Sequence, residues 1–398
     1  MKVKIGIIGI GGRGSHFGML IEAHPDAEVK ALCDPNQTRA KAAGDILGGT
    51  YNYYTEIEAM LGAEELDAVV ITSPDNCHSD NAVAAIKKGA NVLLDKPLAT
   101  TVAGCKAVIE AANAAGKIAM MGFNLRHDPT LKRLKEIVDD GILGRVFLIE
   151  NREFYNGGRT YMARWNRKYE ISGGLWIHKG SHDFDVFGWL LNFPQPVKVS
   201  ATAGISVLNE DNIPFELEDG KPVGPTCGKC HYRKICKDYS GYEKNAMWDD
   251  KAIAEDQYER DLCIYTSDKS VHDNGISIVE YEGGIRASHM ECFITSLTDR
   301  LYTVVGTKGQ AEVSLHERTI LIRPRWSQET IRYSIPTLDG SHGGADPKLV
   351  DAFIETVIGT RKNTSTLEQG LLATVVGQAS EIASREERTV MISELMET

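Results

Sequence analysis

The order of elements in the first 34 residues constrains the fold of this chain more than any other feature. Residues 2–8, KVKIGII, alternate at first and then run continuously apolar. A strand that is buried on both faces of a parallel sheet has this pattern. A glycine-rich turn, GIGGRG, follows at residues 9–14, and a helix is predicted from Ser15 to Ala23. A second apolar strand ends at Asp34, 20 residues beyond Gly14. This order predicts a unit that binds a dinucleotide.

Each glycine of the turn has a physical reason to be there. Gly9 permits the tight turn, Gly11 lets the backbone approach a pyrophosphate, and Gly14 lets the helix pack closely while its first N–H groups hold phosphate charge. Asp34 would accept the ribose hydroxyls and repel a 2′-phosphate, which favours NAD over NADP. Arg39 lies nearby and could soften that preference, but a solvated helix arginine is the favoured interpretation. The cofactor-binding residues predicted here are Gly9, Gly11, Gly12, Arg13, Gly14 and Asp34.

Strands and helices continue to alternate up to about residue 123. Helices of this length between apolar strands indicate βαβ units, so residues 1–123 are predicted to form a doubly wound parallel sheet of the Rossmann type. Ligands of such sheets bind at the carboxyl ends of the strands. Two short segments fall at those ends, and they add Ser73, Pro74, His78, Asp95 and Lys96 to the predicted cofactor-binding residues.

Residues 124–398 have a different texture and are predicted to form a second, α+β domain. Long alternating runs, separated by turns at residues 282–284 and 307–309, indicate hairpins of a large, mostly antiparallel sheet. Two helices, at about 347–360 and 366–385, are expected to pack back on the first domain. A polar segment at about 209–263 interrupts the strands.

Length and composition exclude several classes of function. A chain of 398 residues is suited to two domains, and its net charge of −11 argues against nucleic acid or an anionic membrane as a partner. No stretch is long enough to span a membrane. Eight cysteines are too few for a disulfide scaffold, which favours a reduced, cytoplasmic protein with a small-molecule ligand.

Three further motifs carry a resemblance to a known family. They are TSPDNCH at residues 72–78, DKP at 95–97 and GSHDFD at 180–185, which follow the glycine turn in the family's order. With them the chain resembles the Gfo/Idh/MocA oxidoreductases, which usually have EKP at the second motif and G-x-H-x-x-D at the third. The resemblance implies an enzyme that oxidises or reduces a carbinol of a sugar, cyclitol or related polyol with a nicotinamide cofactor. It also implies a homo-oligomer, either a dimer or a tetramer.

The resemblance implies three catalytic residues. Lys96 would lie at the reacting hydroxyl, where an ammonium stabilises developing alkoxide charge, and a neutral His182 would accept the proton. His178 stands where the family commonly has an aspartate. Because residues i and i+4 of a helix share a face, we expect His178 to orient substrate or to relay the proton. A zinc site on these two histidines is disfavoured, since the glutamate of H-E-x-x-H is absent and Lys179 would repel the metal.

Four residues are candidates for contact with the substrate. Arg126 matches a family position near substrate, and Asp185 matches the family's trailing acid. Arg164 precedes a glycine turn, and His342 belongs to SHGGAD (341–346), which resembles a loop that folds over the sugar in some relatives. Each has a plain alternative: a linker residue, a helix-surface acid, a polar loop and a surface turn, respectively.

The interrupting segment holds a cysteine cluster. Its C-x2-C-x5-C spacing, with a fourth cysteine just beyond, is compatible with a structural Zn²⁺ ion, and His231 could replace one sulfur. Four reduced thiols and an iron–sulfur cluster are the alternatives. The candidate ligands are Cys227, Cys230, Cys236 and Cys263.

These features together predict an NAD-dependent dehydrogenase of a secondary alcohol in a sugar, glycoside or cyclitol. A second interpretation is an enzyme that cleaves a glycoside by transient oxidation with bound NAD. A third is a non-catalytic NAD-binding sugar sensor, against which the presence of both Lys96 and His182 argues.

Overall fold

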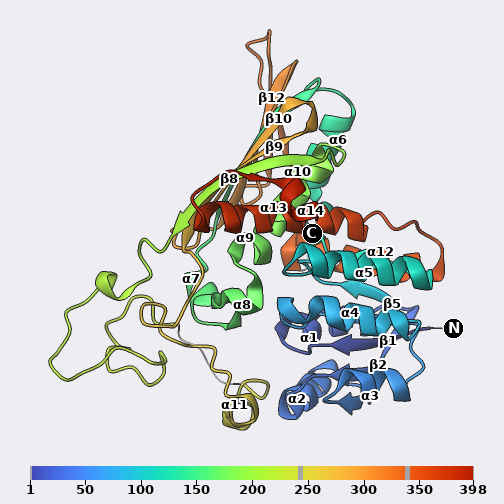
Figure 1. Ribbon diagram of the computed structural model, residues 1–398, viewed down its shortest axis with the longest axis vertical. Coiled ribbons are helices and arrows are strands. Elements are labelled where there is room, and N and C mark those ends of the chain that lie inside the picture. Colours follow the sequence, from blue (N-terminus) through green and yellow to red (C-terminus); the bar gives the residue numbers. More distant parts are fainter. Residues whose placement is uncertain (1, 241–244, 337–340, 398) are drawn as a thin grey trace.

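Two sheets, one parallel and one mixed, organise the structure (Figure 1). The structure is a computed structural model, and it describes residues 2–240, 245–336 and 341–397. The first sheet has six strands in the order β3-β2-β1-β4-β5-β6, all paired in parallel. This confirms the doubly wound sheet predicted from the apolar runs. The strands are β1 Val3–Ile8, β2 Ala27–Cys33, β3 Asn52–Tyr54, β4 Ala68–Ile71, β5 Asn91–Leu94 and β6 Ala119–Met121.

The first of the connecting helices begins earlier than its sequence predicts. Helix α1 begins at Gly12 rather than at Ser15, so part of the glycine turn already belongs to the helix. Thr101 caps α5 by accepting from the Gly104 N–H, and Gly116 ends it in the left-handed conformation. The helices are α1 Gly12–Glu22, α2 Gln37–Leu47, α3 Ile57–Ala63, α4 His78–Lys87 and α5 Val102–Ala115.

The second sheet has nine strands and is mostly antiparallel, as predicted. Its order is β14-β13-β12-β11-β7-β10-β9-β8-β15, and only β7 and β10 run parallel among its described pairs. Both predicted hairpins are present, one joining β9 to β10 and the other joining β11 to β12. The strands are β7 Val146–Phe154, β8 Pro196–Gly204, β9 Asn274–Tyr281, β10 Ile285–Cys292, β11 Asp299–Gly306, β12 Gly309–Ser314, β13 Thr319–Pro324, β14 Ile331–Ser334 and β15 Val390–Met391.

Two long helices near the end of the chain tie the sheets together. Helix α13, Leu367–Arg385, lies between α5 of the first sheet and β8 of the second. Helix α12, Ser341–Ile358, packs Leu349 and Phe353 into the core beside Ile5 of β1. Its start corrects a prediction, because the segment 341–346 was expected to be a loop. The helix begins at Ser341 even though Gly343 and Gly344 within it have positive φ.

The remaining helices are short and lie mainly around the edge between the sheets. None of the helices in the described ranges is both long enough and apolar enough to cross a membrane. They are η1 Asp75–Cys77, η2 Asn124–His127, α6 Pro129–Asp139, α7 Gly158–Tyr161, η3 Trp165–Arg167, α8 Tyr169–Ser172, α9 Leu175–His178, α10 Ser181–Leu190, η4 Glu210–Asn212, α11 Asp250–Asp256, η5 Glu282–Gly284 and α14 Ile392–Met396.

The segment between β8 and β9 forms an extension at the side of the molecule (Figure 1). Apart from η4 and α11, its described residues form no helix, and their strand pairing is limited to a single bridge between Thr226 and Leu262. The extension leaves the second sheet and returns past α2 of the first, where α11 packs. It therefore reaches both halves of the molecule.

Candidate functional site

Two glycines of the turn after β1 leave no room for a side chain. Gly9 has a φ of +82°, and a Cβ on it would lie 2.5 Å from the Ser73 nitrogen. A Cβ on Gly14 would lie 2.3 Å from the Gly9 oxygen, whereas one on Gly12 would meet nothing within 4 Å. No side chain caps the first turn of α1, so its N–H groups stay available to an anion. These features fit a turn that cradles the pyrophosphate of a dinucleotide.

Asp34 is held in a fixed orientation at the end of β2. Its two carboxylate oxygens accept from the Asn36 N–H at 2.9 Å and the Ile10 N–H at 3.0 Å. Burial raises the pKa of the Asp34 carboxyl, and the backbone donors and Arg39 oppose that shift. The Arg39 guanidinium lies 3.5 Å from Asp34. The acid and the arginine thus lie together at the end of β2, where the sequence predicts the ribose.

Arg13 joins the glycine turn to other parts of the chain. Its Nε donates to Asp95 at 3.1 Å, and its Nη1 donates to Asp346 of α12 at 2.9 Å. Both carboxylates are buried, so the arginine is an internal bridge. Arg13 and Asp95, both predicted to bind cofactor, therefore bind each other.

The loops after β4 and β5 are fastened together by His78. Its Nδ1 lies 2.7 Å from the Pro97 oxygen and its Nε2 lies 3.0 Å from the Ser73 oxygen. The ring is buried, and both nitrogens face carbonyls, so His78 positions the two loops. Ser73 accepts at its hydroxyl from Asn81 at 2.9 Å, and Pro74 leads into η1.

Lys96 follows β5 and points at the segment that carries the histidines. Its Nζ donates to the backbone oxygen of His178 at 2.5 Å. Burial lowers the pKa of Lys96 to about 8, a shift that Asp75 and Asp95 oppose and that Lys179 favours. A lysine of this kind loses its proton far more easily than an exposed one.

His178 forms a carboxylate–imidazole pair with Asp75. The His178 Nδ1 lies 2.6 Å from an Asp75 oxygen, and its Nε2 lies 3.3 Å from the Asn166 amide nitrogen. An ionised Asp75 accepts a hydrogen bond only, so it places the ring proton on Nδ1 and leaves a lone pair on Nε2. Burial lowers the pKa of His178, and Asp75 opposes this shift. Trp165 packs edge-on against the ring at 5.2 Å.

His178 and His182 were predicted to share a face because they would lie four residues apart in one helix. The structure corrects that reason, because the two histidines do not lie in one continuous helix. Helix α9 ends at His178 and α10 begins at Ser181. Gly180 joins them, and a Cβ there would lie 2.7 Å from the Trp176 oxygen, so this close approach needs glycine. His182 lies in the first turn of α10, half-buried, and its N–H donates to the Lys179 oxygen at 3.3 Å.

Arg126 and Asp185 form a buried ion pair with each other. The Arg126 Nε and Nη2 donate to the two Asp185 oxygens at 2.8 and 2.5 Å, and its Nη1 donates to the Thr364 oxygen and to Gln369. Burial raises the pKa of the Asp185 carboxyl, and Arg126 opposes the shift. The two predicted substrate contacts therefore neutralise each other inside the protein.

The other two predicted substrate residues differ in how far they can be placed. Arg164 immediately precedes η3, close enough to Tyr258 of the extension for its charge to act on that phenol. The side chain of His342 lies outside the described part of the structure. Asp346 of the same segment is buried against Arg13 and Asn124.

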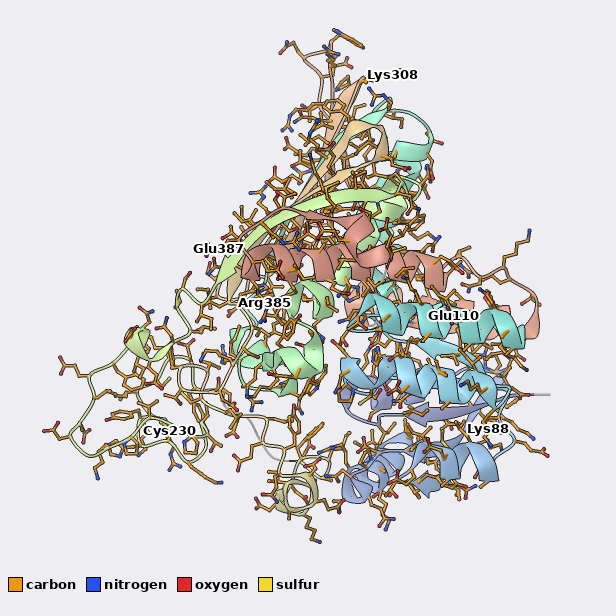
Figure 2. All side chains as sticks on the ribbon, viewed as in Figure 1. Lys88, Glu110, Cys230, Lys308, Arg385 and Glu387 are labelled. Carbon is orange, nitrogen blue, oxygen red and sulfur yellow. The ribbon has the colours of Figure 1, made fainter. Side chains whose placement is uncertain are left out.

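The cysteines of the extension give the zinc hypothesis no support. Within residues 2–240, 245–336 and 341–397, no group of three or more His, Cys, Asp or Glu side chains is arranged to hold a metal ion. All eight cysteines are free thiols. Cys230, placed among the loops of the extension in Figure 2, accepts from the Gly224 N–H at 3.5 Å. Burial raises the pKa of both Cys227 and Cys236, so their thiols stay protonated.

Comparison with known proteins identifies the family. A model of an oxidoreductase family with an NAD-binding Rossmann fold matches residues 3–123, and a model of that family's C-terminal alpha/beta domain matches residues 135–392. The chain belongs to the Gfo/Idh/MocA oxidoreductase family. The earlier resemblance is thereby confirmed, and so is an NAD-binding Rossmann fold.

Individual members of the Gfo/Idh/MocA family cover most of the chain. The Bacillus subtilis (strain 168) protein named "Putative oxidoreductase YteT" is 30% identical over 319 residues, 74% of this chain and 73% of that protein. Inositol 2-dehydrogenase of Salmonella typhimurium (strain LT2) is 34% identical over 270 residues, 60% of this chain and 78% of that enzyme. An oxidoreductase domain protein from Kribbella flavida superposes with a TM-score of 0.76 at 18% identity, covering 98% and 99% of the two chains, which shows the shared fold.

Sequence reasoning assigned no role to two residues that hold the histidine site. Asp75 orients His178 from η1, and Asn166 contacts the same ring from η3. Asp75 follows β4 directly after Ser73 and Pro74, so the argument from strand ends that selected those residues applied to it as well. Nothing in the sequence around Asn166 signals its contact, since the loop that carries it is ordered by tertiary packing.

Proposed function

We propose that this protein is an NAD-dependent dehydrogenase that acts on a secondary alcohol of a sugar, glycoside or cyclitol. Several proteins that it resembles are named for such substrates. They include the inositol 2-dehydrogenases and, at 16% identity over 98% of this chain, a levoglucosan dehydrogenase in complex with NADH. An aldose-aldose oxidoreductase from Caulobacter crescentus has the same fold, with a TM-score of 0.70 at 20% identity.

The observation that carries the proposal is the meeting of three titratable groups beside the glycine turn. Lys96, Asp75 and His178 come from the ends of β5 and β4 and from α9, and they are linked by contacts of 2.5 and 2.6 Å. A carboxylate, an imidazole and an amine with a lowered pKa are the groups that proton transfer at neutral pH requires.

Each group has a task in this proposal. The nicotinamide of a bound dinucleotide supplies the hydride chemistry. Protonated Lys96 stabilises negative charge that develops on the substrate oxygen, and His182 takes the hydroxyl proton. His178, oriented by Asp75, accepts a hydrogen bond from a neighbouring hydroxyl of the substrate at Nε2, in place of the Asn166 amide.

The coenzyme preference and the assembly are also proposals. We propose NAD over NADP because the Asp34 carboxylate would repel a 2′-phosphate and because Arg39 is already engaged by that acid. We propose a homo-oligomer because the second sheet exposes large apolar side chains on the two strands that flank β10: Phe147 and Leu148 of β7, and Ile276 and Ile278 of β9. The cytoplasmic location and the division into domains of residues 1–123 and 124–398 remain proposals as well.

The test is an absorbance assay for NADH across a panel of inositols, free sugars and glycosides. We expect at least one substrate to be turned over by the wild-type protein. Lys96→Met and His182→Ala are expected to lower kcat by about 10²-fold or more and to leave NADH binding intact. Hydride transfer that survives His182→Ala would refute the assigned role. Glycoside cleavage without net NADH would instead favour the transient-oxidation enzyme.

A further inference from the structure

The extension between β8 and β9 is attached to the dinucleotide-binding sheet at its adenosine end. Asn36, in the loop that follows Asp34, donates its side-chain amide to the Ala252 oxygen of α11 at 2.7 Å. Arg39 donates to Asp256 at 2.7 Å, and the Thr38 backbone N–H donates to Glu255 at 3.2 Å. Every one of these contacts crosses from the extension to the segment expected to hold the ribose.

Trp248 of the extension lies over the glycine turn. A Cβ on Gly11 would meet the edge of its indole ring at 4.0 Å, and no other atom within that distance. The Arg39 and Arg260 guanidinium carbons each lie 4.3 Å from the Trp248 ring centroid. Trp248 is buried in the core cluster that contains Ile10 of the glycine turn and Phe17 of α1. The tryptophan therefore contacts the same part of the turn as a pyrophosphate would.

The other end of this segment contacts the wall of the histidine site. The Tyr258 hydroxyl lies near the backbone N–H of Trp165, which opposes the rise that burial causes in the pKa of that phenol, and Trp165 packs on the His178 ring. Residues 247–260 thus run from the glycine turn, past α2, to the loop that carries Trp165. We call residues 247–260 the clasp.

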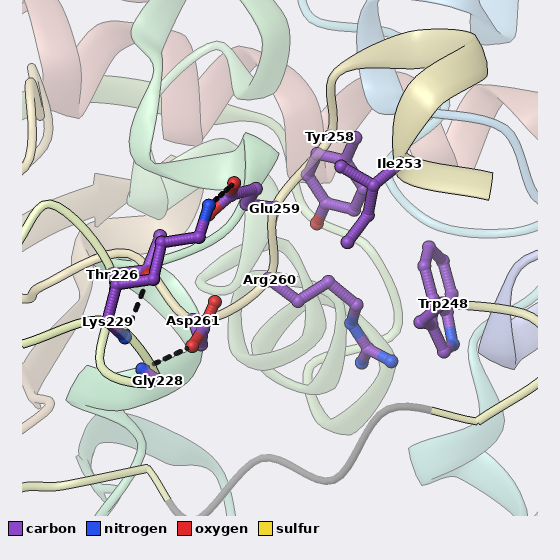
Figure 3. Close-up of a pocket in the computed structure, with 9 residues that line it drawn as sticks. All are labelled: Thr226, Gly228, Lys229, Trp248, Ile253, Tyr258, Glu259, Arg260 and Asp261. Atoms are coloured by element: carbon purple, nitrogen blue, oxygen red, sulfur yellow. Dashed lines mark hydrogen bonds and ion pairs between the residues drawn. The ribbon is translucent and has the colours of Figure 1, made fainter. Parts of the chain in front are cut away.

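A pocket of about 200 Å³ borders the indole (Figure 3). Trp248 and Tyr258 form one part of its wall, and Lys229 and Asp261 lie on the opposite side. The pocket leaves unfilled space beside the indole ring.

We propose that the clasp is a gate of the dinucleotide site: it opens to admit the dinucleotide and then closes over its adenosine half, so that exchange is slow. This rests on the proposed function, since it assumes that the groove holds NAD. The contacts of Glu255 and Asp256 with α2 keep the gate closed. Because the gate must open for both entry and release, loosening it raises both rate constants, whereas loss of an ordinary ligand contact changes mainly the release rate.

The experiment measures NADH exchange with the full chain by stopped-flow fluorescence. Association is followed on mixing with NADH, and dissociation is followed on displacement by excess NAD. The test variant is Glu255→Gln/Asp256→Asn. Its matched control is Glu216→Gln/Asp219→Asn, which makes the same charge change at exposed positions of the same extension. Trp248→Ala is a second test, with the 78% exposed Trp326→Ala as its control.

We expect both test variants to raise the association and dissociation rate constants of NADH by about tenfold, and both controls to stay within twofold of wild type. Unchanged rates in the Glu255/Asp256 variant would overturn the gate while leaving NAD binding intact. The same increase in the charge control would also overturn it. A wild-type protein that binds no NADH would instead overturn the dinucleotide site itself, and the gate with it.

Discussion

Lys96 gives the sharpest prediction, because its pKa determines how activity changes with pH. Burial lowers that pKa from 10.5 to about 8, against the opposing charges of Asp75 and Asp95. In the proposed mechanism only the ammonium form stabilises charge on the substrate oxygen. The rate should therefore follow the protonated fraction of Lys96, and activity should decline on the alkaline side.

The size of the decline follows from the pKa. With a pKa of about 8, the protonated fraction is about 90% at pH 7, about half at pH 8 and about 10% at pH 9. The initial rate should therefore fall about ninefold between pH 7 and pH 9. An exposed lysine with the ordinary pKa of about 10.5 would remain about 97% protonated at pH 9 and would give almost no change.

The assay is an initial-rate profile from pH 6 to 10 with saturating NAD and the substrate that the panel identifies. Lys96→Arg is the diagnostic variant, since a guanidinium keeps its charge throughout this range. It is expected to be slower overall but to lack the decline centred near pH 8. A wild-type profile that is flat to pH 9.5, or a decline that persists in Lys96→Arg, would refute the reasoning. Acetylation of Lys96 at graded pH, quantified by mass spectrometry, reports the same pKa without any substrate.

Four further predictions address other parts of the structure. Gly14→Ala should abolish NADH binding in a fluorescence titration, since its Cβ would lie 2.3 Å from the Gly9 oxygen, whereas Gly12→Ala should bind within a few-fold of wild type. Asp75→Asn should lower kcat by about tenfold or more and move the acidic limb of the profile to lower pH, because the Asp75 charge raises the pKa of its imidazole partner. Arg126→Leu should destabilise the protein by about 3–5 kcal/mol in denaturant titrations, because it leaves the buried Asp185 carboxylate unpaired. Arg126→Leu/Asp185→Leu should recover part of that loss. KM should be unchanged in both variants. Elemental analysis of protein purified without chelator should find no stoichiometric zinc.

The part of the fold that the sequence predicts best is the part whose signals are local. The strands at residues 3–8 and 27–33 are recognised by the spacing of their apolar residues, and the glycine turn by the backbone conformation that glycine permits. No distant contact is needed to recognise them. Gly116 and the hairpin turns at 282–284 and 307–309 are local in the same sense. Strand β3 and helix α3 were not predicted, because three and seven residues carry too little periodicity to stand out.

The site was predicted less completely, because several polar residues owe their place to tertiary partners. Arg126 and Asp185 were both assigned to substrate, but 59 positions separate them in the chain and a sequence gives no sign that they pair. His78 matched a family motif, yet its ring is used to join two loops. A motif identifies which residues gather near a strand end. It does not distinguish a residue that touches the ligand from one that holds the loop.

His178 illustrates what the structure adds to a motif. The family commonly has an aspartate at this position, and a histidine there removes a negative charge from the surroundings of Lys96. Asp75, which contacts the His178 ring at 2.6 Å, supplies a carboxylate from a different element. That charge is the largest of the effects that raise the pKa of Lys96 against burial. The pair therefore restores a carboxylate near the lysine. It also adds a neutral Nε2 that can accept a hydrogen bond. An aspartate in place of His178 would also accept a hydrogen bond, but it would carry a negative charge. Under the proposed function, the ring nitrogen and the amine would each hold one hydroxyl of the substrate.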